Sequence, residues 1–136
     1  MFLGEYINRY IEKTNENRWI GKEAEQMKND ITLREMQQQV DDYIAQFKEG
    51  YFSPLALMAR LTEEVGELAR EVNHYYGEKP KRSDEEENTI DMELADCLFI
   101  LLCFANSLDI DLKKSFSDMM HKFNTRDADR WTRKDE

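Results

Sequence analysis

Apolar residues recur at three- and four-residue intervals over four stretches of the chain, the spacing that gathers them on one face of an α-helix. The stretches cover about residues 32–48, 53–76, 89–108 and 112–123. Gly50 follows the first stretch and Gly77 follows the second, as expected at helix ends. The pattern predicts an all-α fold, a four-helix bundle-like protomer whose first two helices form an antiparallel hairpin.

The second predicted helix carries one apolar stripe, which we expect to be its buried face. At 100° per residue the members of the stripe fall within about 60° of one another. They are Leu61, Val65, Leu68 and Val72.

The third predicted helix is apolar almost all round, because every residue from 94 to 105 except Asp96 is apolar. Such a helix is typical of the middle of a bundle or an oligomer, so we expect Asp96 to be buried. The run is too short to span a bilayer. Cys97 and Cys103 lie six residues apart within it and would point in opposite directions, which predicts buried, reduced thiols.

Length and charge narrow the functional classes. The 136 residues suffice for one domain, and the polar, weakly patterned residues 1–30 are a predicted N-terminal extension of a domain at 31–136. The net charge of −10 disfavours nucleic acid and anionic membranes as partners. No apolar signal segment opens the chain, so we expect a cytoplasmic protein.

Acidic residues on the second predicted helix are the first candidate for chemistry. Glu64, Glu67 and Glu71 fall together on one flank of the apolar stripe. Glu63 lies near the opposite side of the helix. Like charges at this spacing repel one another, and a cation would relieve the repulsion.

Acidic residues on the third predicted helix strengthen the case. Glu93 and Asp96 are i, i+3 neighbours, and no lysine or arginine lies between residues 89 and 108. A buried carboxylate without a partner is costly, and a divalent cation shared with Glu64 and Glu67 would remove that cost. Carboxylate oxygens suit Mg²⁺, with Mn²⁺ as a possible substitute. Either motif alone is typical of a solvated helix face, but the combination favours a metal site.

The strings EEVGEL, from Glu63, and ELAD, from Glu93, resemble the signature of the MazG-like nucleotide pyrophosphohydrolases of the all-α NTP pyrophosphatase group. That signature is E-E-x-x-E, a spacer and E-x-x-D, and here the spacer between Glu67 and Glu93 has 25 residues. The flanking strings MARLTEEVGELAREVN and HKFNTRDADRW are similar to short single-domain members. The resemblance covers about residues 33–133.

The resemblance implies a set of metal ligands and catalytic residues. Mg²⁺ would be bound by four carboxylates, namely Glu64, Glu67, Glu93 and Asp96. Glu63, Glu64 and Glu67 would be the catalytic glutamates, and either Glu64 or Glu67 would accept the proton of the attacking water.

The resemblance also implies a substrate and an assembly. Members of the family hydrolyse the α–β phosphate bond of an NTP or dNTP to a monophosphate and pyrophosphate, a reaction of nucleotide-pool housekeeping, and they form homodimers or dimers of dimers. Lys122, Asn124 and Arg126 would bind the phosphates, although cations are also favoured at any helix C-terminus. Aromatic residues that could stack on the base, or could equally belong to the core, are Phe47, Tyr51, Phe52 and Tyr75.

Two alternatives fit parts of the sequence. A di-iron carboxylate bundle uses E-x-x-H twice. Glu71 with His74 makes one such motif, whereas Asp118 with His121 is imperfect. The other alternative is a non-catalytic helical oligomerisation module, whose stability would not respond to Mg²⁺ as that of a hydrolase would.

Overall fold

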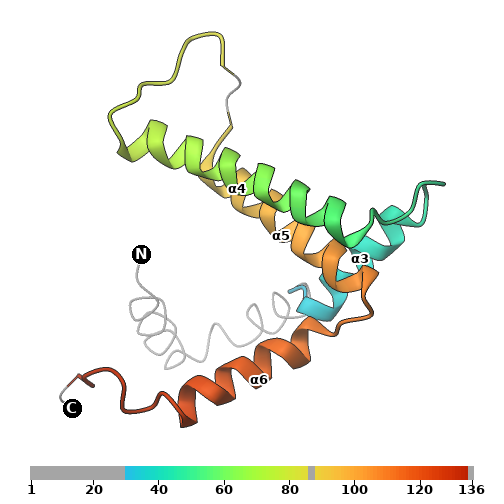
Figure 1. Cartoon of the computed structure of the whole chain (residues 1–136), viewed down its shortest axis with the longest axis vertical. Coiled ribbons are helices and arrows are strands. Elements are labelled where there is room, and N and C mark those ends of the chain that lie inside the picture. Colours follow the sequence, from blue (N-terminus) through green and yellow to red (C-terminus); the bar gives the residue numbers. More distant parts are fainter. Residues whose placement is uncertain (1–29, 86–87, 135–136) are drawn as a thin grey trace, which may run out of the picture. The chain divides into compact units, whose positions relative to one another are not determined.

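The computed structural model describes residues 30–85 and 88–134, which form four α-helices and no strand. They are α3 (Leu33–Ile44), α4 (Pro54–Tyr76), α5 (Ile90–Ser107) and α6 (Leu112–Thr125) (Figure 1). The predicted all-α fold is confirmed. The described residues from Leu33 onward belong to one compact unit. The predicted extension at 1–30 lies outside the described residues except for Asp30, so the domain boundary at 31 stays a prediction.

The two ends of α4 are set by local chemistry. The Ser53 hydroxyl accepts a hydrogen bond of 3.3 Å from the Ala56 backbone N–H, and Pro54 takes the first helical position, where no N–H is needed. At the other end, the Gly77 N–H donates to the Asn73 carbonyl oxygen at 2.9 Å. A Cβ at position 77 would collide with that oxygen, so the close approach requires glycine.

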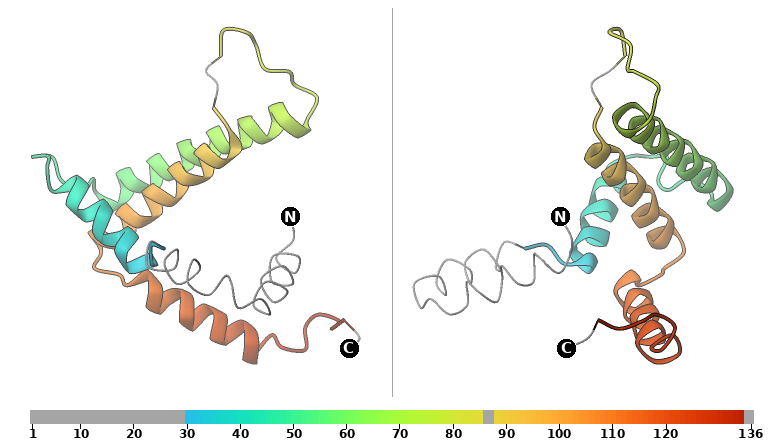
Figure 2. Two further views of the ribbon diagram at one scale, coloured as in Figure 1. Left: turned by 180° about the vertical axis from the view of Figure 1, so that it is seen from behind. Right: turned by 90° about the vertical axis from the view of Figure 1, so that its left-hand side faces the viewer.

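The first helix and its pairing differ from the prediction. α3 ends at Ile44, and the Phe47 N–H then donates to the Ile44 carbonyl at 3.0 Å in a tighter turn. Gly50, at φ 62°, redirects the chain before α4. The predicted hairpin of the first two helices is wrong: α3 packs against α5 and α6, and the antiparallel pair is α4 with α5, which lie side by side (Figures 1 and 2).

The hydrophobic core lies where α3 meets the start of α4 and the second half of α5. Its buried members are Val40, Leu57, Leu102 and Cys103. Seven partly buried side chains pack around them: Leu33, Met36, Ile44, Tyr51, Phe99, Phe104 and Leu112. The core therefore holds one end of the α4–α5 pair.

The buried face of α4 coincides with only half of the predicted stripe, since Leu61 and Leu68 are half-buried. Val65 and Val72 are 49% and 39% exposed, whereas Leu57, Glu64 and Glu71 are buried. The buried residues are seven apart, so they form one line along the helix, which faces α5. Two of the three places on this line are taken by acids, which a pattern of apolar residues does not reveal.

α5 is not buried all round within one chain. Its exposed apolar residues include Leu94, Leu98 and Leu101, which are 53%, 41% and 45% exposed. Asp96 is exposed as well, so the expectation that it is buried is wrong for the single chain. The reason is that α3 and α4 cover only part of the circumference of α5.

The cysteines and the helix lengths bear on two further expectations. Cys97 and Cys103 are buried free thiols, as predicted. Among the described residues, no helix is both long enough and apolar enough to cross a membrane.

A polar network joins α3 to the turn between α5 and α6. The Gln37 side-chain amide donates to Asn106 Oδ1 at 2.9 Å and to the Ile110 carbonyl at 2.8 Å, and its oxygen accepts from the Leu112 N–H at 3.0 Å. Asn106 Nδ2 donates to the Gln37 carbonyl at 2.8 Å and to the Tyr51 hydroxyl at 3.0 Å. The network positions α6 relative to α3.

Replacing Gln37 with alanine is expected to lower the free energy of unfolding by about 2 kcal/mol, because the partners of three inter-element hydrogen bonds lose them. Among the described residues, the side chain of the neighbouring Gln38 bonds only with Asp42, within its own helix, at 2.8 Å. The matched Gln38→Ala variant should change stability by no more than about 0.5 kcal/mol. Urea unfolding followed by circular dichroism measures both, and equal losses in the two variants would contradict the role of the network.

Tyr51 predicts a pH dependence of stability in the alkaline range. Burial and the 2.7 Å hydrogen bond that its hydroxyl donates to Asp41 raise the pKa of Tyr51 from 10.0 to about 12. The folded state therefore holds this proton more tightly than the unfolded state, and stability falls as the pH rises from about 10 towards 12. In Tyr51→Phe the fall in the free energy of unfolding over this pH range should disappear. In Tyr76→Phe, at a 77% exposed position, the fall should remain.

Candidate metal centre

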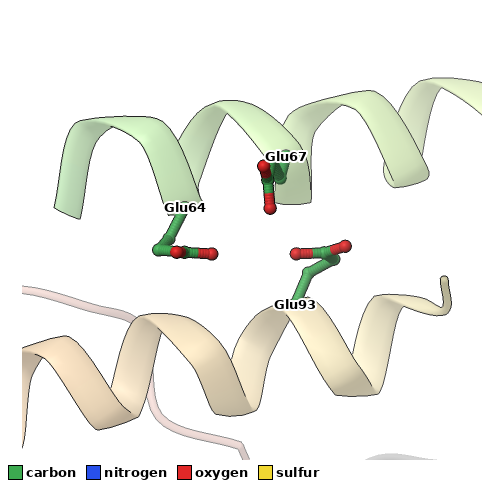
Figure 3. Close-up of side chains that lie close together, drawn as sticks. All are labelled: Glu64, Glu67 and Glu93. Atoms are coloured by element: carbon green, nitrogen blue, oxygen red, sulfur yellow. The ribbon is translucent and has the colours of Figure 1, made fainter. Parts of the chain in front are cut away.

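Three carboxylates from two helices converge between α4 and α5. Glu64 and Glu67 project from α4, and Glu93 projects towards them from the first turn of α5 (Figure 3). One oxygen of each lies within 4.8 Å of one oxygen of both others. We call these three residues the carboxylate trio. Their i, i+3 spacing on α4 and the pairing of α4 with α5 bring them together.

Burial makes the trio energetically demanding. Glu93 is 1% exposed and Glu64 is 7% exposed, whereas Glu67 faces solvent. The Oε2 atom of Glu93 is buried and has no hydrogen-bond partner. A buried carboxylate oxygen without a donor is rare because it forfeits its hydration without compensation. The described residues therefore supply neither a hydrogen-bond donor nor a cation to this oxygen.

Burial and neighbouring acids raise the pKa values of the two buried members of the trio. Burial raises the pKa of Glu93, and the negative charges of Glu67, Asp96 and Glu71 raise it further. Burial followed by the charge of Glu67 likewise raises the pKa of Glu64. A cation at the trio would oppose both effects and favour the ionised carboxylates.

Asp96 and Glu63 lie near the trio without belonging to it. The charge of Asp96 affects the pKa of both Glu64 and Glu93, which places it nearby, yet its oxygens fall outside the group of close carboxylates. Glu63 is exposed and accepts a hydrogen bond of 2.6 Å from Arg60. The roles of Asp96 as a ligand and of Glu63 in catalysis stay predictions.

Arg60 is a functional candidate that the sequence analysis missed. Its Nη2 donates to Glu64 Oε1 at 2.8 Å, and its Nη1 bonds with Glu63. The signal was present in the sequence, because Arg60 stands three and four residues before the two glutamates, which is the spacing of neighbours on a helix.

Lys81 is a second residue that the analysis missed. Its ammonium group lies 3.1 Å from Glu71 Oε2 and also donates to the Asn88 carbonyl at 3.2 Å. Glu71 is buried and paired with this cation, which distinguishes it from the members of the trio although the sequence placed all three α4 glutamates on one flank. The ten-residue separation across a loop gave no signal for the pairing.

Aromatic residues form a cavity of about 400 Å³ at the α3 end of α4. Phe47, Tyr51 and Phe52 line it together with Phe99, and Arg60 stands in its wall. The fourth predicted aromatic candidate, Tyr75, lines a different cavity with Glu71 and Lys81 near the other end of α4. The predicted base-stacking residues thus divide into a group of three and one that lies apart.

The predicted phosphate-binding residues lie at the end of α6. Lys122 and Asn124 belong to its last turn, and Arg126 follows it and pairs with Asp127 at 3.1 Å. All three are exposed. α6 packs mainly against α3 rather than α4, so its packing does not bring them to the trio of the same chain.

The geometry does not favour a di-iron site. Over the described ranges, the trio is the one group of three acid, histidine or cysteine side chains close enough for a metal ion, and it contains no histidine. His74 lies at the far end of α4, where its Nδ1 is hydrogen-bonded to the Lys79 carbonyl at 3.1 Å and its Nε2 lies 3.3 Å from Glu85 Oε2, and His121 is exposed on α6.

Comparisons with known proteins agree with the geometry. Residues 52–131 match the MazG nucleotide pyrophosphohydrolase domain. YpjD of Bacillus subtilis (strain 168) is 64% identical over 108 residues, which make up 79% of this chain and 97% of YpjD.

Two solved structures are similar in fold. The crystal structure of YpjD from Bacillus subtilis has a TM-score of 0.64 at 62% identity, and the match covers 71% of this chain and 98% of that one. The crystal structure of the Bacillus-conserved MazG protein, a nucleotide pyrophosphohydrolase, has a TM-score of 0.62 at 60% identity over 71% of this chain and 94% of that one. This chain therefore belongs to the MazG nucleotide pyrophosphohydrolase family and is a hydrolase of phosphoric anhydrides.

Proposed function

We propose that this enzyme hydrolyses the α–β phosphate bond of an NTP or dNTP, with Mg²⁺ held by Glu64, Glu67 and Glu93. The observation that carries the proposal is that Glu93, whose buried Oε2 has no hydrogen-bond partner, lies close to two further carboxylates. Three close carboxylates without histidine or cysteine suit a hard cation such as Mg²⁺, with Mn²⁺ as a substitute. Asp96 is proposed as a fourth ligand, since its charge already reaches the trio.

Each residue of the site then has a task. A bound cation supplies charge that neutralises phosphate oxygens and makes water easier to deprotonate. Glu67 is the proposed general base, through the carboxylate oxygen that does not bind the cation, because Glu67 is exposed to the solvent that supplies the attacking water, whereas Glu64 is buried. The buried Glu93 anchors the cation from the opposite helix.

The aromatic cavity is proposed to hold the nucleobase. Phe47, Tyr51 and Phe52 offer ring faces within about 400 Å³, a volume suited to a small planar group. The hydroxyl of Tyr51 is held by Asp41 and Asn106, so its ring is fixed in place. Since Leu57 and Arg60 of α4 line the same cavity, it lies about one helical turn from Glu64.

A second copy of the chain is the proposed partner. Exposed apolar side chains occur on three helices: Met58, Val65 and Val72 on α4, Leu94, Leu98 and Leu101 on α5, and Phe116, Met119 and Phe123 on α6. We propose a homodimer or dimer of dimers that covers these side chains. In it, Lys122, Asn124 and Arg126 would bind the phosphates at the site of a neighbouring copy. The net charge of −10 gives no support for nucleic acid or a membrane as a partner.

Glu93→Gln is expected to separate stability from activity. Pyrophosphate release from a panel of NTPs and dNTPs should fall on the order of 100-fold or more, because the cation loses a charged ligand. The metal-free variant should be more stable than the wild type by about 1–3 kcal/mol, because a buried carboxylate is replaced by a neutral amide. The increase in melting temperature on adding Mg²⁺ should be lost. Glu78→Gln, at an exposed position, is the control.

Three results would reject parts of this proposal. Release of orthophosphate would mean that another bond is cleaved. An unchanged response of Glu93→Gln to Mg²⁺ would remove the trio as the metal site. No turnover of any nucleotide, together with no effect of Mg²⁺ on the melting temperature, would favour the oligomerisation module.

Leu101→Lys is expected to weaken self-association on the order of 100-fold, because it places a charge on the exposed apolar face of α5. Light scattering should give the wild type a mass at least twice the 16.3 kDa of one chain and the variant a lower mass at the same concentration. Gln38→Lys, on the exposed face of α3, should remain associated. A monomeric wild type would disprove the proposed assembly but would not contradict the proposed metal site.

A further inference from the structure

Arg60 links the aromatic cavity to the carboxylate trio. It stands in the wall of the cavity, and its guanidinium group bonds with Glu63 at 2.6 Å and with Glu64 at 2.8 Å. Among the described residues, it alone both lines this cavity and bonds with a member of the trio. The guanidinium group is therefore placed to contact a molecule that occupies the cavity and extends to the trio.

The two partners of Arg60 differ in environment. The side chain of Glu63 is 61% exposed, whereas that of Glu64 is 10% exposed and contributes an oxygen to the trio. The charge of Arg60 lowers the pKa of Glu64, against the stronger effects of burial and of Glu67. In the chain without ligands, Arg60 thus provides part of the positive charge that the trio requires.

Other nearby cations are less suited to this task. Lys81 is engaged by Glu71 and by the Asn88 carbonyl. The charge of Arg70 lowers the pKa of Glu93 by less than burial and the neighbouring acids raise it, and no hydrogen bond joins Arg70 to the trio within the described part of the chain. Arg60 is 44% exposed and hence has room to move.

We propose that Arg60 changes partners when the enzyme binds its substrate with Mg²⁺. In the free enzyme its guanidinium group bonds with both Glu63 and Glu64. In the substrate complex the guanidinium group leaves Glu64, because the positive charge of Mg²⁺ at the trio repels it. It then binds the phosphate nearest the sugar, while its other edge stays bonded to Glu63. The inference rests on the proposed function and adds a substrate-binding residue to it.

The chemistry of arginine fits both states. A guanidinium group presents several donors in one plane, so it can keep a carboxylate on one edge and bind a phosphate on another. Glu63 becomes a positioning residue, which acts on the substrate through Arg60. This accounts for an exposed first glutamate in the EEVGEL string that does not reach the trio.

The test measures two affinities that should move in opposite directions in Arg60→Gln. Binding of Mg²⁺ alone, followed by calorimetry, should become about two- to fivefold tighter, because a competing surface ion pair is removed. Binding of α,β-methylene analogues of ATP, GTP, CTP and UTP at saturating Mg²⁺ should become about 10- to 100-fold weaker, because a charged hydrogen bond to phosphate is lost. Arg34→Gln removes a comparable ion pair, with Asp111 at 2.6 Å, and should change neither affinity.

Two further variants keep the inference testable if Arg60→Gln folds poorly. Arg60→Lys keeps the charge and most of the stem, so it should bind Mg²⁺ like the wild type and recover only part of the nucleotide affinity. Glu63→Gln should weaken nucleotide binding in the wild type but add little to Arg60→Gln, because the two residues act as one unit.

The outcomes separate this inference from the proposed function. If Arg60→Gln weakens both affinities, or changes neither, while Glu93→Gln abolishes Mg²⁺ binding, the metal site stands and the exchange of partners by Arg60 is wrong. If Glu93→Gln binds Mg²⁺ like the wild type, the proposed metal site itself fails, and the inference fails with it.

Discussion

The structure depends on a contact between α4 and α5 that is apolar at one end and acidic in the middle. Leu57, Leu102 and Cys103 hold the helices together near α3. Further along, Glu64 and Glu93 occupy the same interface with their charges facing each other. The apolar end must therefore offset the repulsion in the middle, and the pair of helices is less stable than one with apolar residues throughout. Stored repulsion of this kind is what a cation can release on binding.

Cations of the chain flank the carboxylate trio on both sides along α4. Arg60 bonds with Glu64, and Lys81 pairs with Glu71 seven residues further along the same buried line. Both ion pairs lie partly in solvent, so they moderate the charge of the interface without filling the space between the helices. The trio is left with an excess of negative charge and with one unpartnered oxygen on Glu93. The proposed metal site and the proposed mobility of Arg60 both follow from this incomplete neutralisation.

The single chain also leaves many hydrophobic side chains exposed. The described residues bury few large hydrophobic side chains, and α4, α5 and α6 each expose several. Val65 and Leu101 illustrate it, since both lie on helices that contribute to the core and yet are nearly half exposed. A second copy that covers these side chains would supply the burial that one chain lacks. The exposed faces of α4 and α5 belong to the two helices that carry the trio, so the proposed assembly and the proposed metal site would share these helices.

The sequence by itself determined the helices, the two acidic motifs and the family. Periodicity and punctuation are local properties, so the starts of α4, α5 and α6 came within two residues of their places. The i, i+3 spacing placed Glu64 and Glu67 on one helix face, and the absence of a basic residue near Glu93 pointed to a cation shared with them. Only the tertiary structure decided which faces are buried: it put Glu64 rather than Val65 against α5 and left Asp96 exposed. It also paired Lys81 with Glu71 across a loop and α4 with α5 instead of α3. These outcomes depend on how helices pack against one another, and a helical repeat does not contain that information because it specifies a face but not the neighbour that covers it.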